Sequence, residues 1–238
     1  MIKGIIFDMD NTLLQSRIDF AAMKNDLQRL LAEHDLIEEG LQVDEYTPSM
    51  LLQHAREQEG GRRIEPLLLE TITRYEYAGM KDVGLEPGAS ELLHKLRGNY
   101  TLVLLTNNAQ AATERALRAT ALYPLFELII CRDQVKALKP APDGYELAKS
   151  HFPEIAPEQW VSVGDAWIDG RASIDASIPF IAYKTSVEHM RSKGVEPVAS
   201  IQALSELIAW LRDRRTDVSD ALGGHAGAPA YNAELQDS

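Results

Sequence analysis

The sequence predicts an α/β fold, a doubly wound and mainly parallel Rossmann-like sheet that carries an inserted α-helical cap subdomain. Short apolar runs alternate with helical patterns, which favours parallel strands joined by right-handed crossovers. The apolar runs occupy residues 2–7, 100–105, 128–131, 160–163 and 180–183. Between the first and second runs the chain contains no convincing β-type run, and its apolar residues recur at helical spacing. This segment is therefore expected to be an insertion.

The order of these patterns divides the chain into three parts. We expect a core domain made of residues 1–14 and 86–213, a helical cap over 15–85, and a flexible tail over 214–238. The segment Glu86-Pro87-Gly88 marks the end of the insertion, because proline and glycine interrupt helices. The tail is polar and rich in small residues, which predicts little structure of its own.

Helices are expected in both the cap and the core. In the cap, helical spacing of apolar residues is clearest around Leu27, Leu51 and Leu68. Ser200 is a suitable residue to cap the last core helix, which would carry Ile201 and Leu211 on its apolar face. The other core helices are expected over residues 89–97, 111–119 and 145–149.

Composition limits the partners and the compartment. The net charge of −12 argues against a nucleic-acid backbone or an anionic membrane surface as the main partner. No apolar stretch approaches the roughly 20 residues that span a bilayer. The single cysteine, Cys131, excludes an internal disulfide and fits a reducing compartment, where a small buried residue is its expected role. Because the first strand begins almost at the first residue, no signal segment is expected, and we predict a cytoplasmic protein.

Asp8 and Asp10 directly follow the first apolar run. An apolar run that stops at a carboxylate indicates a buried strand that ends at the carboxyl edge of a sheet, where open α/β sheets bind their ligands. Two carboxylates one residue apart repel each other, so the pair requires a cation or a shared proton. A polar turn is the alternative interpretation, since Asp, Asn and Thr12 all favour turns.

Three further strand ends carry reactive side chains. Thr106 follows the second run, Lys139 the third, and Asp165 with Asp169 the fourth. All strands of a parallel sheet end at the same edge, so these residues are expected to meet in one crevice beside the first aspartates. This convergence favours a catalytic site over a simple turn.

The expected chemistry is phosphoryl transfer to a carboxylate. Asp8 comes first after its strand and is best placed to attack phosphorus, which would form an aspartyl-phosphate and divide one difficult displacement into two easier ones. Several acids lie near the anionic substrate, so Mg²⁺ is expected to compensate their charge. The predicted protein ligands are Asp8, Asp165 and the backbone carbonyl of Asp10.

The remaining groups would serve the phosphoryl oxygens and the proton transfers. Lys139 supplies a positive charge, and the Thr106 hydroxyl and the Asn107 backbone amide can donate hydrogen bonds to the phosphoryl oxygens. Asp10 is expected to protonate the leaving oxygen and later to deprotonate the hydrolytic water.

These residues resemble the motifs of the haloacid dehalogenase-like (HAD) superfamily, over residues 2–211. Four motifs occur in the family's order and at compatible spacing. They are Asp8-Met9-Asp10-Asn11-Thr12, Leu105-Thr106-Asn107, Leu138-Lys139-Pro140, and Gly164-Asp165 followed by Asp169.

The resemblance implies a Mg²⁺-dependent phosphatase that acts on a small phosphorylated metabolite. It implies Asp8 as nucleophile, Asp10 as acid and base, Thr106 and Lys139 as phosphate binders, Asp165 as metal ligand, and Asp169 as the residue that orients a metal-bound water or Lys139. The insertion resembles the helical cap of the phosphoglycolate phosphatase-like branch, which closes over the site and selects substrates. Hinges are then expected near residues 13–17 and 82–87.

Other functions stay open on the sequence alone. Dehalogenases of the family lack an aspartate at the position of Asp10, so phosphate esters are favoured over haloacids. A phosphosugar mutase would share the core motifs, and a non-catalytic module that binds a phosphometabolite or a partner would not need Asp10. The cap lysines Lys24 and Lys81 are expected to be solvated surface charges. Surface pairing with nearby glutamates is expected for the cap arginines Arg56, Arg62 and Arg63, and a contact with an acidic group of the substrate is the alternative. Trp167 is equally compatible with a wall of the site and with packing beneath a loop. The motifs predict neither the substrate nor the oligomeric state.

Overall fold

The computed structural model describes residues 1–37 and 46–223 and confirms the predicted α/β fold. Among these residues, a six-stranded sheet has the order β5-β4-β1-β6-β7-β8, and each neighbouring pair is parallel. Its strands are β1 (Gly4–Phe7), β4 (Thr101–Leu105), β5 (Leu128–Ile130), β6 (Trp160–Gly164), β7 (Phe180–Tyr183) and β8 (Ala199–Ile201). In the register of the central strand, Phe7 lies opposite both Leu104 and Val163.

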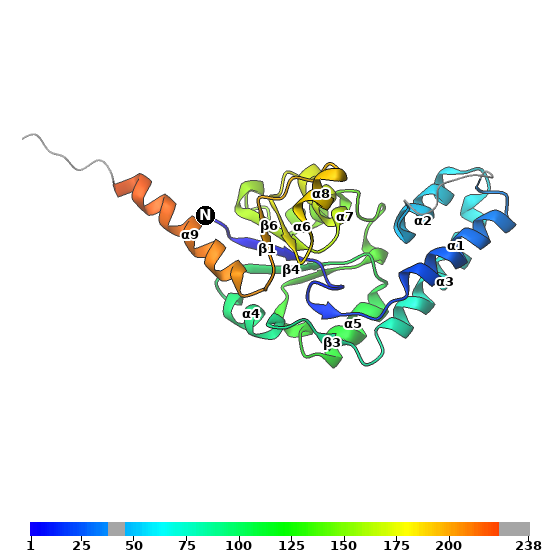
Figure 1. The fold of residues 1–238 in the computed structure, drawn as a ribbon, viewed down its shortest axis with the longest axis horizontal. Coiled ribbons are helices and arrows are strands. Elements are labelled where there is room, and N and C mark those ends of the chain that lie inside the picture. Colours follow the sequence, from blue (N-terminus) through cyan, green and yellow to red (C-terminus); the bar gives the residue numbers. More distant parts are fainter. Residues whose placement is uncertain (38–45, 224–238) are drawn as a thin grey trace, which may run out of the picture.

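Helices cover both faces of the sheet (Figure 1). Successive side chains of β1 point to opposite faces, so Ile5 and Phe7 enter one apolar cluster and Ile6 enters another. The first cluster includes residues of α4 (Ala89–Leu96) and α5 (Gln110–Ala119). The second includes residues of α6 (Asp143–His151) and α7 (Trp167–Asp175), and α8 (Val187–Ser192) follows β7. Short 3₁₀ turns are η2 (Tyr123–Leu125), η3 (Arg132–Gln134) and η4 (Pro157–Gln159).

The insertion forms helices beside the carboxyl ends of the strands (Figure 1). The described part contains α1 (Phe20–Glu33), α2 (Pro48–Glu57) and α3 (Gly61–Gly79). Asp19 caps α1 by accepting a hydrogen bond from the amide of Ala22 at 2.9 Å, and Thr47 caps α2 in the same way. The predicted apolar positions, Leu27, Leu51 and Leu68 among them, are buried between these helices.

The two ends of the insertion lie side by side, which the sequence did not predict. β2 (Leu14–Gln15) pairs in antiparallel fashion with β3 (Gly84–Leu85), although the segment was expected to contain no strand. Strands of two residues are too short to produce a periodic pattern. Glu86 follows this ribbon and is buried, and its carboxylate accepts hydrogen bonds from the hydroxyl of Tyr183 and the ammonium of Lys184.

The structure corrects the predicted C-terminal helix. Ser200 lies in β8 instead of capping a helix, and α9 (Glu206–Gly223) begins later. The carboxylate of Glu206, the first residue of α9, accepts a hydrogen bond at 2.8 Å from the amide of Ala203 in the turn that leads into the helix. The apolar residues near Ile201 are compatible with either a short strand or a helix, so their spacing could not distinguish the two.

The predicted tail boundary at residue 214 falls inside α9, which continues to Gly223. Figure 1 places this helix at the end of the sheet opposite the insertion. Residues 224–238, the rest of the predicted tail, lie outside the described residues. None of the described helices combines the length and the apolar character needed to cross a membrane.

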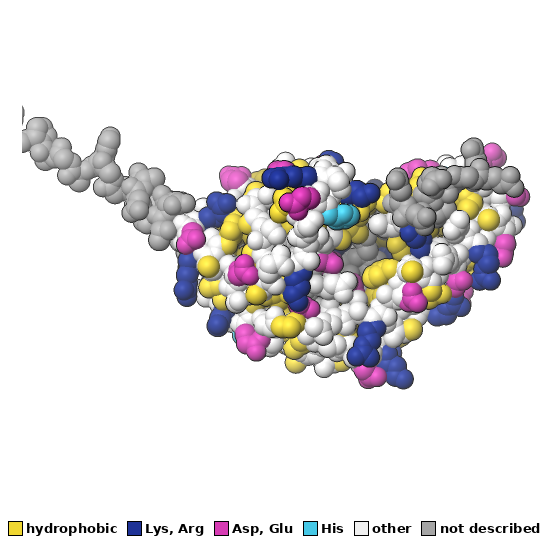
Figure 2. All heavy atoms as spheres, in the orientation of Figure 1, with side chains coloured by type: hydrophobic (Ala, Val, Ile, Leu, Met, Phe, Trp, Pro, Cys, Tyr) yellow, Lys and Arg dark blue, Asp and Glu magenta, His cyan; other side chains and the backbone are white. Residues whose placement is uncertain are grey.

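Charged side chains of both signs are interspersed on the face of the molecule seen in Figure 2. This face shows no broad field of positive charge of the kind that attracts nucleic acid. The distribution agrees with the negative net charge of the chain.

We expect Gly4→Ala to destabilise the fold. A β-carbon at Gly4 would lie 2.2 Å from Cε3 of Trp160, a fully buried ring in the neighbouring strand. Overpacking of this kind costs about 1–3 kcal/mol, which urea denaturation would measure as a lower free energy of unfolding. The control is Gly84→Ala, where the nearest atom would be Gln15 Oε1 at 3.5 Å. Equal stability of the two variants would contradict the close packing of β1 on Trp160.

Candidate active site

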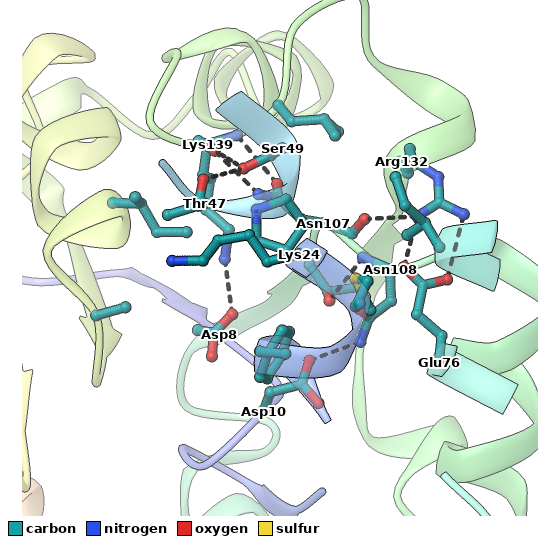
Figure 3. A pocket seen from close by; sticks show the side chains of 18 of the residues that line it. Asp8, Asp10, Lys24, Thr47, Ser49, Glu76, Asn107, Asn108, Arg132 and Lys139 are labelled. Carbon is teal, nitrogen blue, oxygen red and sulfur yellow. Dashed lines mark hydrogen bonds and ion pairs between the residues drawn. The ribbon is translucent and has the colours of Figure 1, made fainter. Parts of the chain in front are cut away.

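A pocket of about 600 Å³ lies between the carboxyl ends of the strands and the inserted helices. Core loops and the helices α1, α2 and α3 contribute to its lining, and Figure 3 shows side chains from both sides pointing into it. The structure brings all the predicted site residues to this pocket: Asp8, Asp10, Thr106, Asn107, Lys139, Asp165 and Asp169.

Lys139 occupies the centre of the site. Its ammonium donates hydrogen bonds to Asp8 Oδ1 and Asp169 Oδ1, both at 2.6 Å, and to the carbonyl oxygen of Leu105 at 3.0 Å. Burial alone would lower the pKa of this lysine, but the charges of Asp169 and Asp8 outweigh that effect and raise it. Lys139 is therefore fully protonated at neutral pH.

Among the described residues, oxygens of Asp8, Asp165 and Asp169 lie within 4.8 Å of one another. Burial raises the pKa of Asp8, which Lys139 partly opposes, and burial together with the charge of Asp169 raises the pKa of Asp165 to about 7. One ammonium does not balance three carboxylates. The donor set therefore fits a hard divalent cation such as Mg²⁺, which prefers carboxylate oxygens.

The two carboxyl oxygens of Asp169 already have partners. Oδ1 accepts from Lys139, and Oδ2 accepts from the amide of Ala166 at 3.1 Å. This second bond ties the start of α7 to the loop after β6. Both carboxyl oxygens of Asp169 are thus engaged by groups of the core.

Asp10 has a different environment from Asp8. Its Oδ2 accepts a hydrogen bond from the Asn108 amide at 2.6 Å, and its Oδ1 is buried with no hydrogen-bond partner among the described residues. Burial raises the pKa of Asp10 to about 6, an effect that the neighbouring Ser16 and Asn108 partly offset. A carboxyl group with this pKa can both give and take a proton near neutral pH.

A tight turn over residues 11–13 follows the two aspartates. Asn11 has a φ of 54°, a left-handed conformation that asparagine tolerates better than most residues. The amides of Leu13 and Leu14 both donate to the carbonyl oxygen of Met9 at 3.0 Å. The side chains of Asp8 and Asp10 contact different partners, the ammonium of Lys139 and the side-chain amide of Asn108 (Figure 3).

The loop after β4 is joined to Lys139 by the side chain of Asn107. Its Nδ2 donates to the carbonyl oxygen of Lys139 at 2.9 Å, and its Oδ1 accepts from the Lys139 amide at 3.0 Å. In the same loop Thr106 is buried, and its hydroxyl accepts from the amide of Asn108 at 3.2 Å. The sequence predicted a role for the Asn107 backbone amide and missed this role of its side chain.

The inserted helices contact the loop that carries Lys139. Ser49 donates to the carbonyl oxygen of Lys139 at 3.0 Å, and Arg56 donates to that of Lys136 at 3.0 Å. Arg56 also forms two hydrogen bonds with Glu65, at 2.7 and 2.9 Å, which confirms the predicted pairing with a glutamate.

Lys24 differs from expectation, and Trp167 settles an open choice. Lys24 is half-buried and lines the pocket, so it is not the solvated surface charge that was expected, whereas Lys81 is exposed. Trp167 packs against the cluster of Phe180 and Met190 instead of lining the pocket.

The sequence also missed Asn108, Glu76 and Arg132, which line the pocket as well. Asn108 stands next to a motif residue, so its position was a usable signal. Glu76 and Arg132 form a buried ion pair between α3 and η3. Nothing in the local sequence distinguishes Glu76 from the other charged residues of its helix.

Comparison with known proteins identifies relatives of the chain. The model of the haloacid dehalogenase-like hydrolase family matches residues 5–183. A phosphoglycolate phosphatase from Nitrosospira multiformis is 30% identical over 179 residues, which are 72% of this chain and 78% of that protein. An N-acetylmuramic acid 6-phosphate phosphatase from Pseudomonas putida is 28% identical over 194 residues, covering 79% and 85% of the two chains.

A solved structure shows the same fold. The HAD-superfamily hydrolase of subfamily IA from Geobacter sulfurreducens superimposes with a TM-score of 0.59 at 22% identity, covering 88% of this chain and 96% of that one. The shared fold includes nearly the full length of both chains.

We expect Lys139→Met to destabilise the metal-free protein strongly. The substitution leaves the buried carboxylates of Asp8 and Asp169 without their positive partner, and breaking a buried ion pair costs about 3–5 kcal/mol. Chemical denaturation in a chelator at neutral pH would measure the loss. Arg29→Met, which removes an exposed pair with Asp26, is the matched control and should have little effect. A small loss for Lys139→Met would show that the pair is not buried as described.

Proposed function

The chain belongs to the haloacid dehalogenase-like hydrolase family, and we propose that it is a Mg²⁺-dependent phosphatase that hydrolyses a small phosphorylated metabolite through an aspartyl-phosphate. The observation that supports this most directly is the cluster in which Lys139 lies between Asp8 and Asp169, beside Asp165. A cytoplasmic location, predicted from the sequence, is part of the same proposal.

The relatives support a phosphatase in particular. Two of them are named for the removal of phosphate, from phosphoglycolate and from N-acetylmuramic acid 6-phosphate. The pocket of this chain, about 600 Å³ in volume, is large enough for a small metabolite.

In this proposal Asp8, Asp165 and the carbonyl of Asp10 would hold Mg²⁺, which would supply positive charge to offset the acids and the phosphate dianion. A carboxyl oxygen of Asp8 attacks phosphorus, a new oxygen–phosphorus bond forms, and the bond to the leaving oxygen breaks. Lys139 holds the carboxylate of Asp8 in place through Oδ1.

Asp10 is the proposed proton carrier for both halves of the reaction. It protonates the leaving oxygen in the first half. In the second half it is a carboxylate and accepts a proton from the water that attacks phosphorus, while the bond between phosphorus and the Asp8 oxygen breaks and inorganic phosphate is released. The pKa of about 6 supports this role, as does the buried Oδ1, which no group of residues 1–37 or 46–223 engages in a hydrogen bond. Negative charge accumulates on the phosphoryl oxygens, which would accept hydrogen bonds from the Thr106 hydroxyl, the Asn107 backbone amide and the Lys139 ammonium.

We expect Asp8→Asn and Asp10→Asn to abolish most of the turnover of an aryl phosphate in the presence of Mg²⁺. Loss of general acid–base catalysis costs about 10²–10⁴-fold in kcat, and loss of the nucleophile should cost at least as much. Release of inorganic phosphate would be measured, with Asp175→Asn on the exposed side of α7 as the control. Full activity of Asp8→Asn would overturn the proposed nucleophile.

The same assay separates the alternatives. A binding module would bind phosphate analogues without releasing phosphate, and a mutase would isomerise a sugar phosphate faster than it hydrolyses one.

We expect Mg²⁺ to raise the melting temperature of the protein. Binding to the folded state alone stabilises it by about 2.7 kcal/mol at a hundred times the dissociation constant, because the carboxylates are brought together only by folding. Differential scanning calorimetry with and without Mg²⁺ would measure the shift. Asp165→Asn should remove most of it and Asp175→Asn should not. A shift that is the same in both variants would place the ion elsewhere.

A further inference from the structure

We propose that Glu76 and Arg132 are positioning residues, a buried ion pair through which the cap helix α3 fixes the loop that carries Thr106, Asn107 and Asn108. The pair is almost completely buried, with 1% of Glu76 and 6% of Arg132 exposed. Nη1 of Arg132 donates to Oε1 of Glu76 at 2.5 Å, and Nη2 donates to Oε2 at 3.2 Å. Such a two-pronged contact fixes direction as well as distance.

The pair holds the backbone of three consecutive loop residues. The guanidinium of Arg132 donates to the carbonyl oxygen of Asn107 at 3.3 Å. The backbone amide of Arg132 donates to the carbonyl oxygen of Asn108 at 3.0 Å. The amide of Ala109, at the start of α5, donates to Oε2 of Glu76 at 3.0 Å. A carboxylate at a helix N-terminus also stabilises the helix dipole.

On the cap side the pair is fixed by α3. Glu76 belongs to this helix, and Thr73, one turn earlier on the same face, accepts a hydrogen bond from Nη2 of Arg132 at 2.8 Å. The contact therefore joins two turns of α3 to the loop, and Figure 3 shows it on the side of the pocket away from Asp8.

The loop held in this way carries the groups that the proposed reaction needs. The Asn108 side chain donates to Asp10, the Asn107 side chain holds the backbone of Lys139, and Thr106 faces the pocket. A movement of the loop would shift all of them together. This inference rests on the proposed phosphatase function.

Two arguments favour a positioning role over simple stabilisation. Burial raises the pKa of Glu76, and the charge of Arg132 opposes this effect. Burying the carboxylate therefore costs free energy of desolvation, which a pair of apolar side chains at the same place would not. The hydrogen bonds of the pair also end on the backbone of the loop next to the reacting groups, where a displacement of about 1 Å can cost about 10²-fold in rate.

The test uses Glu76→Gln and Arg132→Lys in the full chain. Glu76→Gln keeps the acceptor for Ala109 and removes the charge that balances Arg132. Arg132→Lys keeps the charge and removes the planar fork that reaches Glu76, Thr73 and the loop together. We expect kcat for an aryl phosphate with Mg²⁺ to fall by about 10–10²-fold in both variants while KM changes little, because the loop groups act on the transition state.

Arg74→Gln is the control, since Arg74 lies on the same helix and forms an exposed pair with Asp26. It should leave kcat unchanged. Melting curves would set an assay temperature at which every variant is folded. Hydrogen exchange of the amides of residues 106–109 is a second measurement, independent of turnover, and should become faster in the two test variants only.

The outcomes are distinct. If kcat falls and exchange of the loop quickens while the variants are folded, the positioning role is supported. Unchanged kcat, or a rise in KM alone, would overturn it even if the melting temperature falls. If the unaltered protein releases no phosphate, the proposed function is wrong. In that case hydrogen exchange still tests the pair, because unchanged exchange of residues 106–109 in the variants would show that Glu76 and Arg132 do not fix the loop.

Discussion

The site depends on one buried ammonium group between two carboxylates. Lys139 gains its proton affinity from Asp8 and Asp169, and the lysine in turn makes it possible to bury them. Asp8 directly follows β1, Lys139 lies in the loop after β5, and Asp169 lies in the first turn of α7, which follows β6. A parallel sheet brings these ends to one edge, so the topology and the charge balance require each other.

The two aspartates of the first motif have different hydrogen-bond partners. Asp8 is paired with the ammonium of Lys139 and lies near other acids. Asp10 accepts a hydrogen bond from a neutral amide, and its other oxygen has no partner in the described part of the chain. Environments that differ in this way give neighbouring acids different protonation behaviour.

Residues that follow strands could be located from the sequence because the edge rule of parallel sheets applies to them. Asp8, Thr106, Lys139 and Asp165 are all of this kind, and they meet as expected. Glu76 and Arg132 could not be found in this way, since their meeting depends on how α3 packs against the core. Short strands were missed for another reason: β2, β3 and β8 have too few residues to show alternation.

The ribbon formed by β2 and β3 places the two ends of the insertion next to each other. The inserted helices therefore leave and re-enter the core at neighbouring positions, as the loop of a short hairpin does. Its entry and exit are already paired, so replacing it by a unit of another size would leave the strands and their register intact, and the entropy of closing the longer or shorter loop changes only slowly with length. The core can thus keep its reaction chemistry while the segment that covers it diverges.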